Sequence, residues 1–179
     1  MVRLIFLLIY NLIRALFLKV RFGKCIKINW IQRISPNCAI KVFGHGKLFI
    51  GRNCQMESGC DLQVHSQGVL RIGQRVYMNK YCMVSAHGLV EIGDNCIFGP
   101  GVKLFDNNHK FGKDGVCQEL AVGSIRIGKN CWIASNVVIL KGTEIGDNCI
   151  IGAGCIVKGT IPSGSIVRPD VNNITEKIH

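Results

Sequence analysis

One histidine of the chain stands where general acid–base chemistry could occur. His109 follows the polar run Asp106-Asn107-Asn108 and precedes a stretch, 110–123, that contains glycines and several polar residues. A neutral imidazole, with an ordinary pKa of about 6.5, can remove a proton from a reacting hydroxyl at neutral pH. Its second ring nitrogen must be oriented by an acceptor, and Asp106 or a backbone carbonyl is suitable. His109 is therefore a candidate for a catalytic base, although a histidine at such a position, taken alone, is more often simply solvated.

The ten cysteines are the other residues whose type could do chemistry. No Cys-x-x-Cys pair occurs among them, so their spacing does not predict a structural zinc site. In a reducing cytosol thiols stay free, and a free Cys behaves as a small apolar core residue. Only Cys117, in the stretch after His109, remains a thiol of interest near the predicted chemistry.

An apolar residue recurs every six positions in the C-terminal half of the chain. The unbroken series consists of Ile127, Ile133, Ile139, Ile145, Ile151 and Val157. Neither a helix of 3.6-residue period nor an alternating strand keeps an apolar position at an interval of six. A chain that forms a short strand and a corner every six residues, with three such units to a coil, keeps an apolar position at this interval. The sequence therefore predicts an all-β solenoid, a parallel β-helix built of hexapeptide repeats.

Eight of the ten cysteines occupy one position of this repeat. Each follows an apolar hexad leader by four places, and they are Cys38, Cys54, Cys60, Cys82, Cys96, Cys131, Cys149 and Cys155. That position needs a small side chain that points inward, which a thiol supplies. We therefore expect these cysteines in the core and not in catalysis or in disulfides.

The repeats define three parts of the chain. They run from 34 to 168, irregularly at first, and the loop 110–123 is expected to be extruded from them, a common place for function in solenoids. Residues 169–179 leave the repeat and are expected to form a C-terminal tail. Four Gly-x-x-x-Ile-Gly segments open new coils, and they span 46–51, 68–73, 88–93 and 123–128.

The histidines follow the coils. His65, His87 and His109 are evenly spaced by 22 residues, which suggests the three ligands of a zinc-dependent carbonic anhydrase. A spacing of about one coil, however, stacks side chains along one edge instead of converging them. We therefore expect His45, His65 and His87 to form a structural ladder and predict no metal site. The zinc enzyme stays an alternative.

The N-terminal residues 1–24 differ from the rest of the chain. Their apolar run is interrupted by Asn11 and Arg14, which makes it a poor membrane-spanning helix. At about 100° per residue, one face collects Arg3, Tyr10, Arg14 and Arg21. This pattern predicts a basic amphipathic helix, with residues 1–22 lying in a membrane interface beside anionic lipid. The alternative is packing on its own domain or on a neighbouring subunit.

The charge balance also points to anionic partners. The chain of 179 residues carries 22 Lys+Arg against 11 Asp+Glu, a net charge of +11. It has no zinc-finger spacing and no aromatic stacking platform, so we expect no nucleic-acid partner. An acidic lipid or a phosphate-bearing cofactor fits the charge better.

Two segments resemble a known family. IGDNCIFGPGVKLFDNNH and IGKNCWIASNVVILKGTEIGDNCIIGAGCIVKGTIP are similar to the maltose, galactoside and polysaccharide O-acetyltransferase branch of the hexapeptide-repeat acyltransferases. The resemblance covers about 70–165 well. It implies a left-handed β-helix, acetyl-CoA as co-substrate, and a homotrimer with each site between two subunits. His109 lies 15 residues after Asp94, the spacing of the family's catalytic histidine.

The resemblance also assigns other residues by position. Asn79 matches an asparagine beside acceptor and thioester, and His87 stands at an acceptor-side position that is usually Asp. Ser135 matches a position whose backbone meets the cofactor, where an N–H could stabilise an oxyanion. Ala153 matches a pantetheine contact and Lys158 a further cofactor contact. Where arginines would contact the nucleotide, this chain has instead Asn173 and Glu176.

Together these features predict an acetyl-CoA-dependent O-acetyltransferase. His109 takes the proton of a sugar hydroxyl, which attacks the thioester directly, without a cysteine nucleophile or a metal. The expected acceptor is a cell-surface polysaccharide or lipid-linked saccharide precursor. The expected location is the cytoplasm, extended to peripheral contact with the cytoplasmic face of the inner membrane. The alternatives are serine, amino-sugar or antibiotic acetyltransferases, the zinc-dependent carbonic anhydrase, and a scaffolding β-helix without activity.

Overall fold

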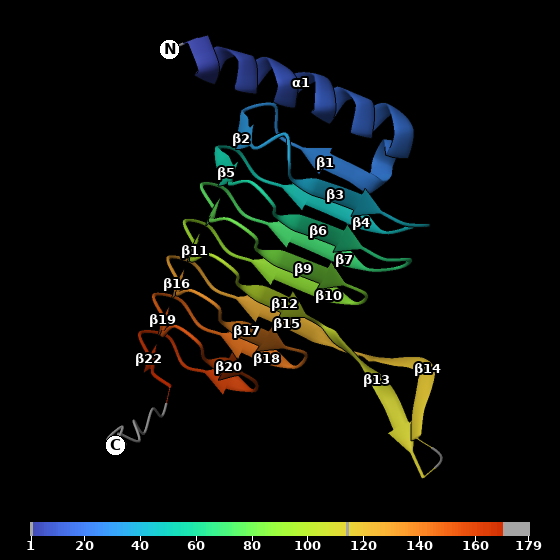
Figure 1. Cartoon of the computed structure of the whole chain (residues 1–179), viewed down its shortest axis with the longest axis vertical. Helices are drawn as coiled ribbons and strands as arrows, with labels where there is room; N and C mark the ends of the chain where they lie inside the picture. Colours follow the sequence, from blue (N-terminus) through green and yellow to red (C-terminus); the bar gives the residue numbers. More distant parts are fainter. Residues whose placement is uncertain (1, 114, 170–179) are drawn as a thin grey trace, which may run out of the picture.

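The chain folds into a solenoid of stacked parallel strands with one helix across its N-terminal end (Figure 1). The computed structural model describes residues 2–113 and 115–169. The helix α1 (Val2–Phe22) and a short 3-10 turn (Gly23–Cys25) precede all of the strands. This mostly-β architecture confirms the predicted fold class and is consistent with a left-handed β-helix.

Three parallel sheets form the walls of the solenoid. Each coil contributes one strand to each wall, except that the last coil contributes only to the first two. The first wall stacks β1 (Ile26–Ile28), β4 (Lys47–Ile50), β7 (Val69–Ile72), β10 (Leu89–Ile92), β15 (Ser124–Ile127), β18 (Thr143–Ile145) and β21 (Thr160–Ile161). The second stacks β2 (Gln32–Ile34), β5 (Cys54–Met56), β8 (Tyr77–Met78), β11 (Ile97–Phe98), β16 (Trp132–Ile133), β19 (Ile150–Ile151) and β22 (Ile166–Val167). The third stacks β3 (Ala39–Val42), β6 (Asp61–Val64), β9 (Met83–Ala86), β12 (Lys103–Phe105), β17 (Val138–Leu140) and β20 (Ile156–Val157).

The strand register keeps equivalent residues of successive coils on top of one another. Ile50 pairs with Ile72, Ile72 with Ile92, and Ile92 with Ile127. The sequence intervals between these residues differ, so the extra residues are accommodated at the corners and in the extruded segment. Their side chains point inward and form one continuous apolar core.

The first coil begins before the expected start at residue 34, because β1 already pairs with β4. Gln32 stands in register with Cys54, so a polar residue fills the inward slot that later coils give to thiols. Its buried amide donates to the Gly51 carbonyl (2.6 Å) and accepts from the Cys54 N–H (3.0 Å).

The eight cysteines of the repeat are buried in the core, as predicted. The Cys54 sulfur lies 3.1 Å from the Gly73 carbonyl oxygen of the next coil, and burial raises the pKa of its thiol to about 11. Cys117 is exposed and Cys25 is half-buried. The buried thiols therefore serve as small core groups that also bond to corner carbonyls.

The corners are tight because the coils stack closely. A Cβ on Gly93 would lie 2.5 Å from the carbonyl oxygen of Gly128, so only glycine fits there. Asn95 and Asn130 adopt positive φ at a neighbouring corner position, and their side-chain amides bond to each other at 2.9 Å.

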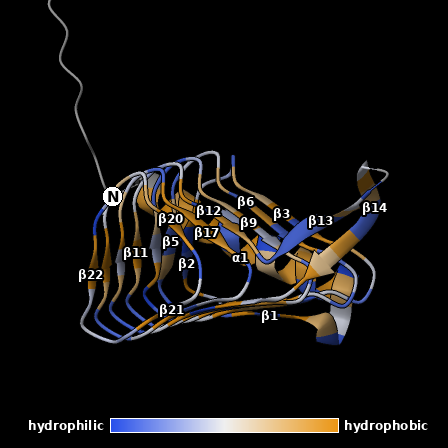
Figure 2. Ribbon diagram, turned by 90° about the horizontal axis from the view of Figure 1, so that it is seen from below, coloured by the Kyte–Doolittle hydropathy of each residue, from blue (hydrophilic) through white to orange (hydrophobic). Residues whose placement is uncertain are grey.

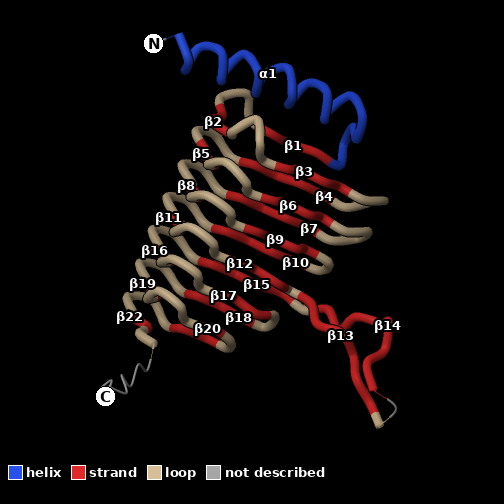
Figure 3. The backbone as a smooth tube through the Cα atoms, in the orientation of Figure 1, coloured by secondary structure: helices blue, strands red, loops and turns tan. Residues whose placement is uncertain are grey.

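The expected loop 110–123 is an antiparallel hairpin. Its strands are β13 (Asn107–Gly112) and β14 (Gly115–Val122), with a register irregularity between His109 and Phe111. The hairpin leaves the solenoid sideways and points away from α1 (Figures 2 and 3). It begins three residues earlier than expected, so His109 lies inside its first strand and not at the end of a coil strand.

The helix α1 covers the open end of the first coil, with contacts to β1 and β2. Asn11 is buried and donates to the Ile34 carbonyl (2.9 Å), and the Arg14 guanidinium donates to the carbonyls of Ser35 (3.4 Å) and Cys38. The helix thus packs on its own domain, the alternative that the sequence offered, with Asn11 and Arg14 turned towards the solenoid and Tyr10 and Arg21 left exposed. Within the described residues, no helix has both the length and the apolarity needed to cross a membrane.

Candidate functional site

His109 lies exposed on β13 and pairs with Leu120 on the facing strand. Its Nδ1 atom is 3.2 Å from the backbone carbonyl oxygen of Cys117. A carbonyl can only accept, so Nδ1 carries the proton in this bond and Nε2 keeps its lone pair. The structure therefore orients His109 through a backbone carbonyl, one of the two acceptors that the sequence suggested.

Asp106, the other suggested acceptor, has a different task. Its side chain is fully buried and accepts hydrogen bonds from the backbone N–H groups of His87 (2.9 Å) and Gly88 (2.7 Å) in the preceding coil. Its own carbonyl accepts from the Gly123 N–H (2.7 Å) at the far side of the hairpin base. Of the two alternatives, the backbone carbonyl is therefore the observed partner of His109, and Asp106 instead fastens the hairpin to the corner.

His87 lies beside this corner in a stack of rings. Its imidazole is 3.8 Å from that of His65, with 12° between the planes, and Phe43 stacks on the other face of His65 at 5.1 Å. The ladder therefore contains two of the three expected histidines, while Phe43 takes the place expected for His45, which is exposed. Burial, and next the charge of His65, lower the pKa of His87 against the opposing effect of Asp106.

Asn79, Ser135 and Ala153 lie at the corner between the second and third walls. Met78, Phe98, Ile133 and Ile151 are in register, so the residues that follow them stack along the solenoid. The Ser135 carbonyl accepts from the Gly154 N–H (2.9 Å), which joins the two later coils. In the part of the chain that the structure describes, the Ser135 N–H donates to no other group.

Lys158 lies at the other end of the third wall. Val157 pairs with Ile139, so Lys158 follows β20 at the corner where His87 and the hairpin base also lie. The strands of the third wall separate this corner from that of Ser135, a span of about 10 Å or more at 3.3 Å per residue. One chain thus carries the predicted residues in two groups at two corners. Asn173 and Glu176 lie outside the described residues.

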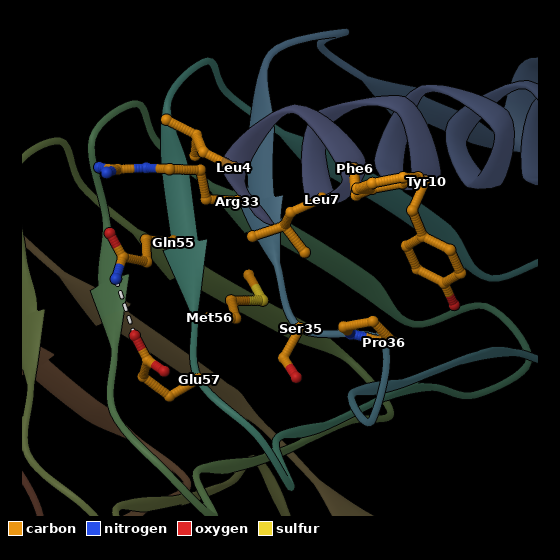
Figure 4. A pocket seen from close by; sticks show the side chains of 10 residues that line it. All are labelled: Leu4, Phe6, Leu7, Tyr10, Arg33, Ser35, Pro36, Gln55, Met56 and Glu57. Atoms are coloured by element: carbon orange, nitrogen blue, oxygen red, sulfur yellow. Dashed lines mark hydrogen bonds between the residues drawn. The ribbon is translucent and has the colours of Figure 1, made fainter. Parts of the chain in front are cut away.

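A hollow lies elsewhere, under the N-terminal half of α1 (Figure 4). It measures about 800 Å³ and is lined by Leu4, Phe6, Leu7, Tyr10, Arg33, Ser35, Pro36, Gln55, Met56 and Glu57. None of the predicted site residues borders it. Over residues 2–113 and 115–169, no three His, Cys, Asp or Glu side chains are grouped as a metal site.

The sequence reasoning missed the fastening role of Asp106. The register of the folded coils explains this role, because Phe105 pairs with Ser85 and the next residue therefore meets the corner at His87. That register depends on how many residues each corner contains, which only the folded coils reveal.

Comparisons with known proteins agree with the repeats. Residues 124–159 match the family model described as bacterial transferase hexapeptide (six repeats). The galactoside O-acetyltransferase of Escherichia coli (strain K12) is 46% identical over 77 residues, 41% of this chain and 36% of that protein. A protein of the same strain named for lipopolysaccharide biosynthesis O-acetyl transfer, WbbJ, is 26% identical over 82% of this chain and 86% of its own length.

A solved structure shares the fold. A mutant of AntD, an N-acyltransferase from Bacillus cereus, in complex with dTDP-4-amino-4,6-dideoxyglucose and Coenzyme A, superimposes with a TM-score of 0.66 at 18% identity. The superposition covers 89% of this chain and 88% of that one. The hexads, the stacked coils and the family match agree with one another. The chain carries a hexapeptide-repeat transferase domain, and the two Escherichia coli proteins described above, to which it is similar, are named as O-acetyltransferases.

Proposed function

We propose that the protein is an acetyl-CoA-dependent O-acetyltransferase that modifies a sugar hydroxyl, with His109 as general base. The observation that carries the proposal is the bond between His109 Nδ1 and the Cys117 carbonyl, since it leaves Nε2 exposed and able to accept a proton.

The chemistry follows from that tautomer. Nε2 of His109 accepts the hydroxyl proton while the sugar oxygen bonds to the acetyl carbon, and it later gives that proton to the departing thiolate sulfur. Acetyl-CoA supplies the activated acetyl group. The hairpin holds the imidazole outside the solenoid, where a bulky saccharide can reach it.

The corner of Ser135 and Ala153 suits the donor. A Cβ on Gly99 would lie 2.6 Å from the Ser135 nitrogen, so the stacked turns are narrow and keep backbone groups near the surface. The Ser135 N–H, which donates to no group in the described residues, can face a developing oxyanion. Lys158 is exposed at the other corner, beside the hairpin base, so it would bring a positive charge to the cofactor's phosphates from the copy that supplies His109.

A homotrimer completes this arrangement. The His109 hairpin and the Ser135 corner lie at different edges of one solenoid, so a base and a donor site come together when the hairpin of one copy faces the corner of the next. Closed cyclic symmetry repeats that contact around the ring. Asn79 lies on the donor corner and His87 beside the base, and both would line the acceptor.

The acceptor is proposed to be a cell-surface polysaccharide or lipid-linked saccharide precursor. Support comes from the similarity, over most of both chains, to a protein named for lipopolysaccharide biosynthesis. Similarity to the galactoside enzyme supports a sugar in more general terms, although the aligned part is about a third of that enzyme.

The proposal is tested by thiol release from acetyl-CoA over a panel of acceptors: free sugars, serine, an amino sugar and lipid-linked glycans. We expect release with saccharide hydroxyls and a product ester that mild base removes. A product that resists base, formed only with the amine, would contradict O-transfer. Metal analysis of the same sample that finds about one zinc per subunit would favour the carbonic anhydrase alternative.

A further inference from the structure

The N-terminal helix presents an apolar face to the outside. Eight of its exposed large side chains lie on one side, and we call them the outward face: Ile5, Phe6, Ile9, Leu12, Ile13, Leu16, Phe17 and Val20. Val20 is 78% exposed and Ile13 62%. At about 100° per residue these side chains form one continuous side of the helix, and soluble proteins rarely expose so large a contiguous apolar patch unless it binds something. We propose that the outward face of α1 docks the protein onto an anionic lipid bilayer.

Asn11 and Arg14 do not oppose docking, because their side chains bond to backbone carbonyls on the inner side of the helix. Asn11 is only 3% exposed and bonds to the Ile34 and Leu7 carbonyls, at 2.9 and 2.8 Å. Arg14 reaches the carbonyls of Ser35 and Cys38. The helix can therefore touch lipid while it stays attached to the solenoid, and no buried polar group has to move into the membrane.

The charge of the helix α1 indicates that the lipid is anionic. The helix has no Asp or Glu, and its last turn carries Lys19 and Arg21. At about 100° per residue, these two cations flank the outward face on opposite sides, where they reach lipid headgroups. Lys19 also lies over the ring of Trp30 (5.4 Å), itself exposed at the same end. Tryptophan and basic residues together mark a membrane–water boundary.

The same charges argue against a second copy as the occupant. Two helices packed face to face would bring Lys19 and Arg21 of both copies to one seam, and the helix contains no acid to pair with them. Phosphate headgroups supply the missing negative charge, so lipid is the occupant that this surface fits.

Docking would set a distance between the bilayer and the acetylated hydroxyl, a consequence that rests on the proposed function. In the third wall β12 lies three strands after β3, and α1 lies across the end of the stack (Figure 1). With strands about 4.8 Å apart and a helix about 10 Å thick, the hairpin base is roughly 25 Å from the lipid surface. The acceptor class is therefore a membrane-tethered saccharide extended by several sugar units, and not a single sugar at the headgroup.

Vesicle flotation of the full-length protein tests the docking. The probes are vesicles of phosphatidylglycerol and phosphatidylcholine in equal parts, and vesicles of phosphatidylcholine alone. We expect binding to the mixed vesicles and a fall of about tenfold or more in the partition coefficient for Ile13→Asp, because an apolar contact becomes an anion. Ile156→Asp is the matched control, since Ile156 is as exposed (73%) but lies in the last coils; its binding should equal that of the wild type.

Two more variants separate the contribution of the basic residues to binding from the proposed catalytic role of His109. Lys19→Gln combined with Arg21→Gln should lower binding to the mixed vesicles about tenfold and leave the weak binding to phosphatidylcholine unchanged. His109→Ala removes the proposed base and should bind vesicles like the wild type, so failure of the acetyltransferase proposal and failure of docking give different results. Wild-type protein that stays with the lipid-free fractions, or Ile13→Asp that floats like the wild type, would overturn the proposal.

Discussion

Replacement of Asp106 by Ala tests how the hairpin is held. The carboxylate accepts from the backbone N–H groups of His87 and Gly88 at 2.7–3.1 Å and is fully buried. Asp106→Ala leaves two backbone donors without a partner, and each unsatisfied buried donor costs about 1–3 kcal/mol. We therefore expect the free energy of unfolding to fall by about 2–5 kcal/mol, measured by urea denaturation followed by circular dichroism.

A matched control is available in another corner. Asp147 also accepts from one backbone N–H, that of Lys129 (2.7 Å), but it is exposed. Asp147→Ala should therefore cost only about 0.5–1.5 kcal/mol. Trypsin cleavage at Lys110 should become faster in Asp106→Ala and stay unchanged in Asp147→Ala, because only the former loosens the hairpin base. Equal unfolding free energies for Asp106→Ala and wild type would refute the fastening role.

Three further predictions concern other parts of the molecule. The pKa of His87 is lowered in the folded state, so the unfolded chain binds more protons near the ordinary histidine pKa, and stability should fall as the pH is lowered from about 8 to about 5. The melting temperature should therefore drop over this pH range, and it should drop less in His87→Gln but not in His45→Gln. An equal dependence of melting temperature on pH in the two variants would contradict the assignment to His87. In native protein a thiol reagent should react rapidly at the exposed Cys117, and Cys117→Ala should remove that phase; rapid reaction of the eight repeat cysteines would show that they are not core groups. Asn11→Ala should lower the unfolding free energy by about 1–3 kcal/mol and speed hydrogen exchange in the helix, because the Ile34 carbonyl loses its donor. An unchanged exchange rate would contradict the role of the Asn11–Ile34 bond in attaching the helix.

Much of the fold could be predicted because the coil is a local repeat. A six-residue interval fixes which side chains point inward, so the leaders and the thiols were assigned without knowledge of any long-range contact. The first coil was missed because Gln32 fills its inward slot with an amide that bonds to Gly51 and Cys54. A polar residue in that slot interrupts the apolar pattern although the strand pairs normally.

The candidate site was less predictable, for reasons of geometry. The sequence placed Asp106 near His109, but Asp106 stands at the bend between β12 and β13, and its carboxylate turns to the backbone of the preceding coil. Asn79 and Lys158 were assigned to one site, yet one chain carries them at two corners. Asn79 follows a strand of the second wall and Lys158 a strand of the third wall, and the wall that a residue follows determines its corner. For the helix, the pattern predicted a polar and an apolar side but not which side packs on the solenoid. The backbone carbonyls of Ile34 and Cys38 determine this, because they accept hydrogen bonds from Asn11 and Arg14.

The central claim is that His109 is the base of an acetyl transfer, and steady-state turnover of acetyl-CoA with a saccharide acceptor tests it most directly. Wild type, His109→Ala and the control Phe111→Ala, an exposed residue of the same hairpin, are compared at equal folded concentration. We predict that kcat falls about 10²–10⁴-fold for His109→Ala and changes little for Phe111→Ala. An unchanged kcat for His109→Ala would contradict the account.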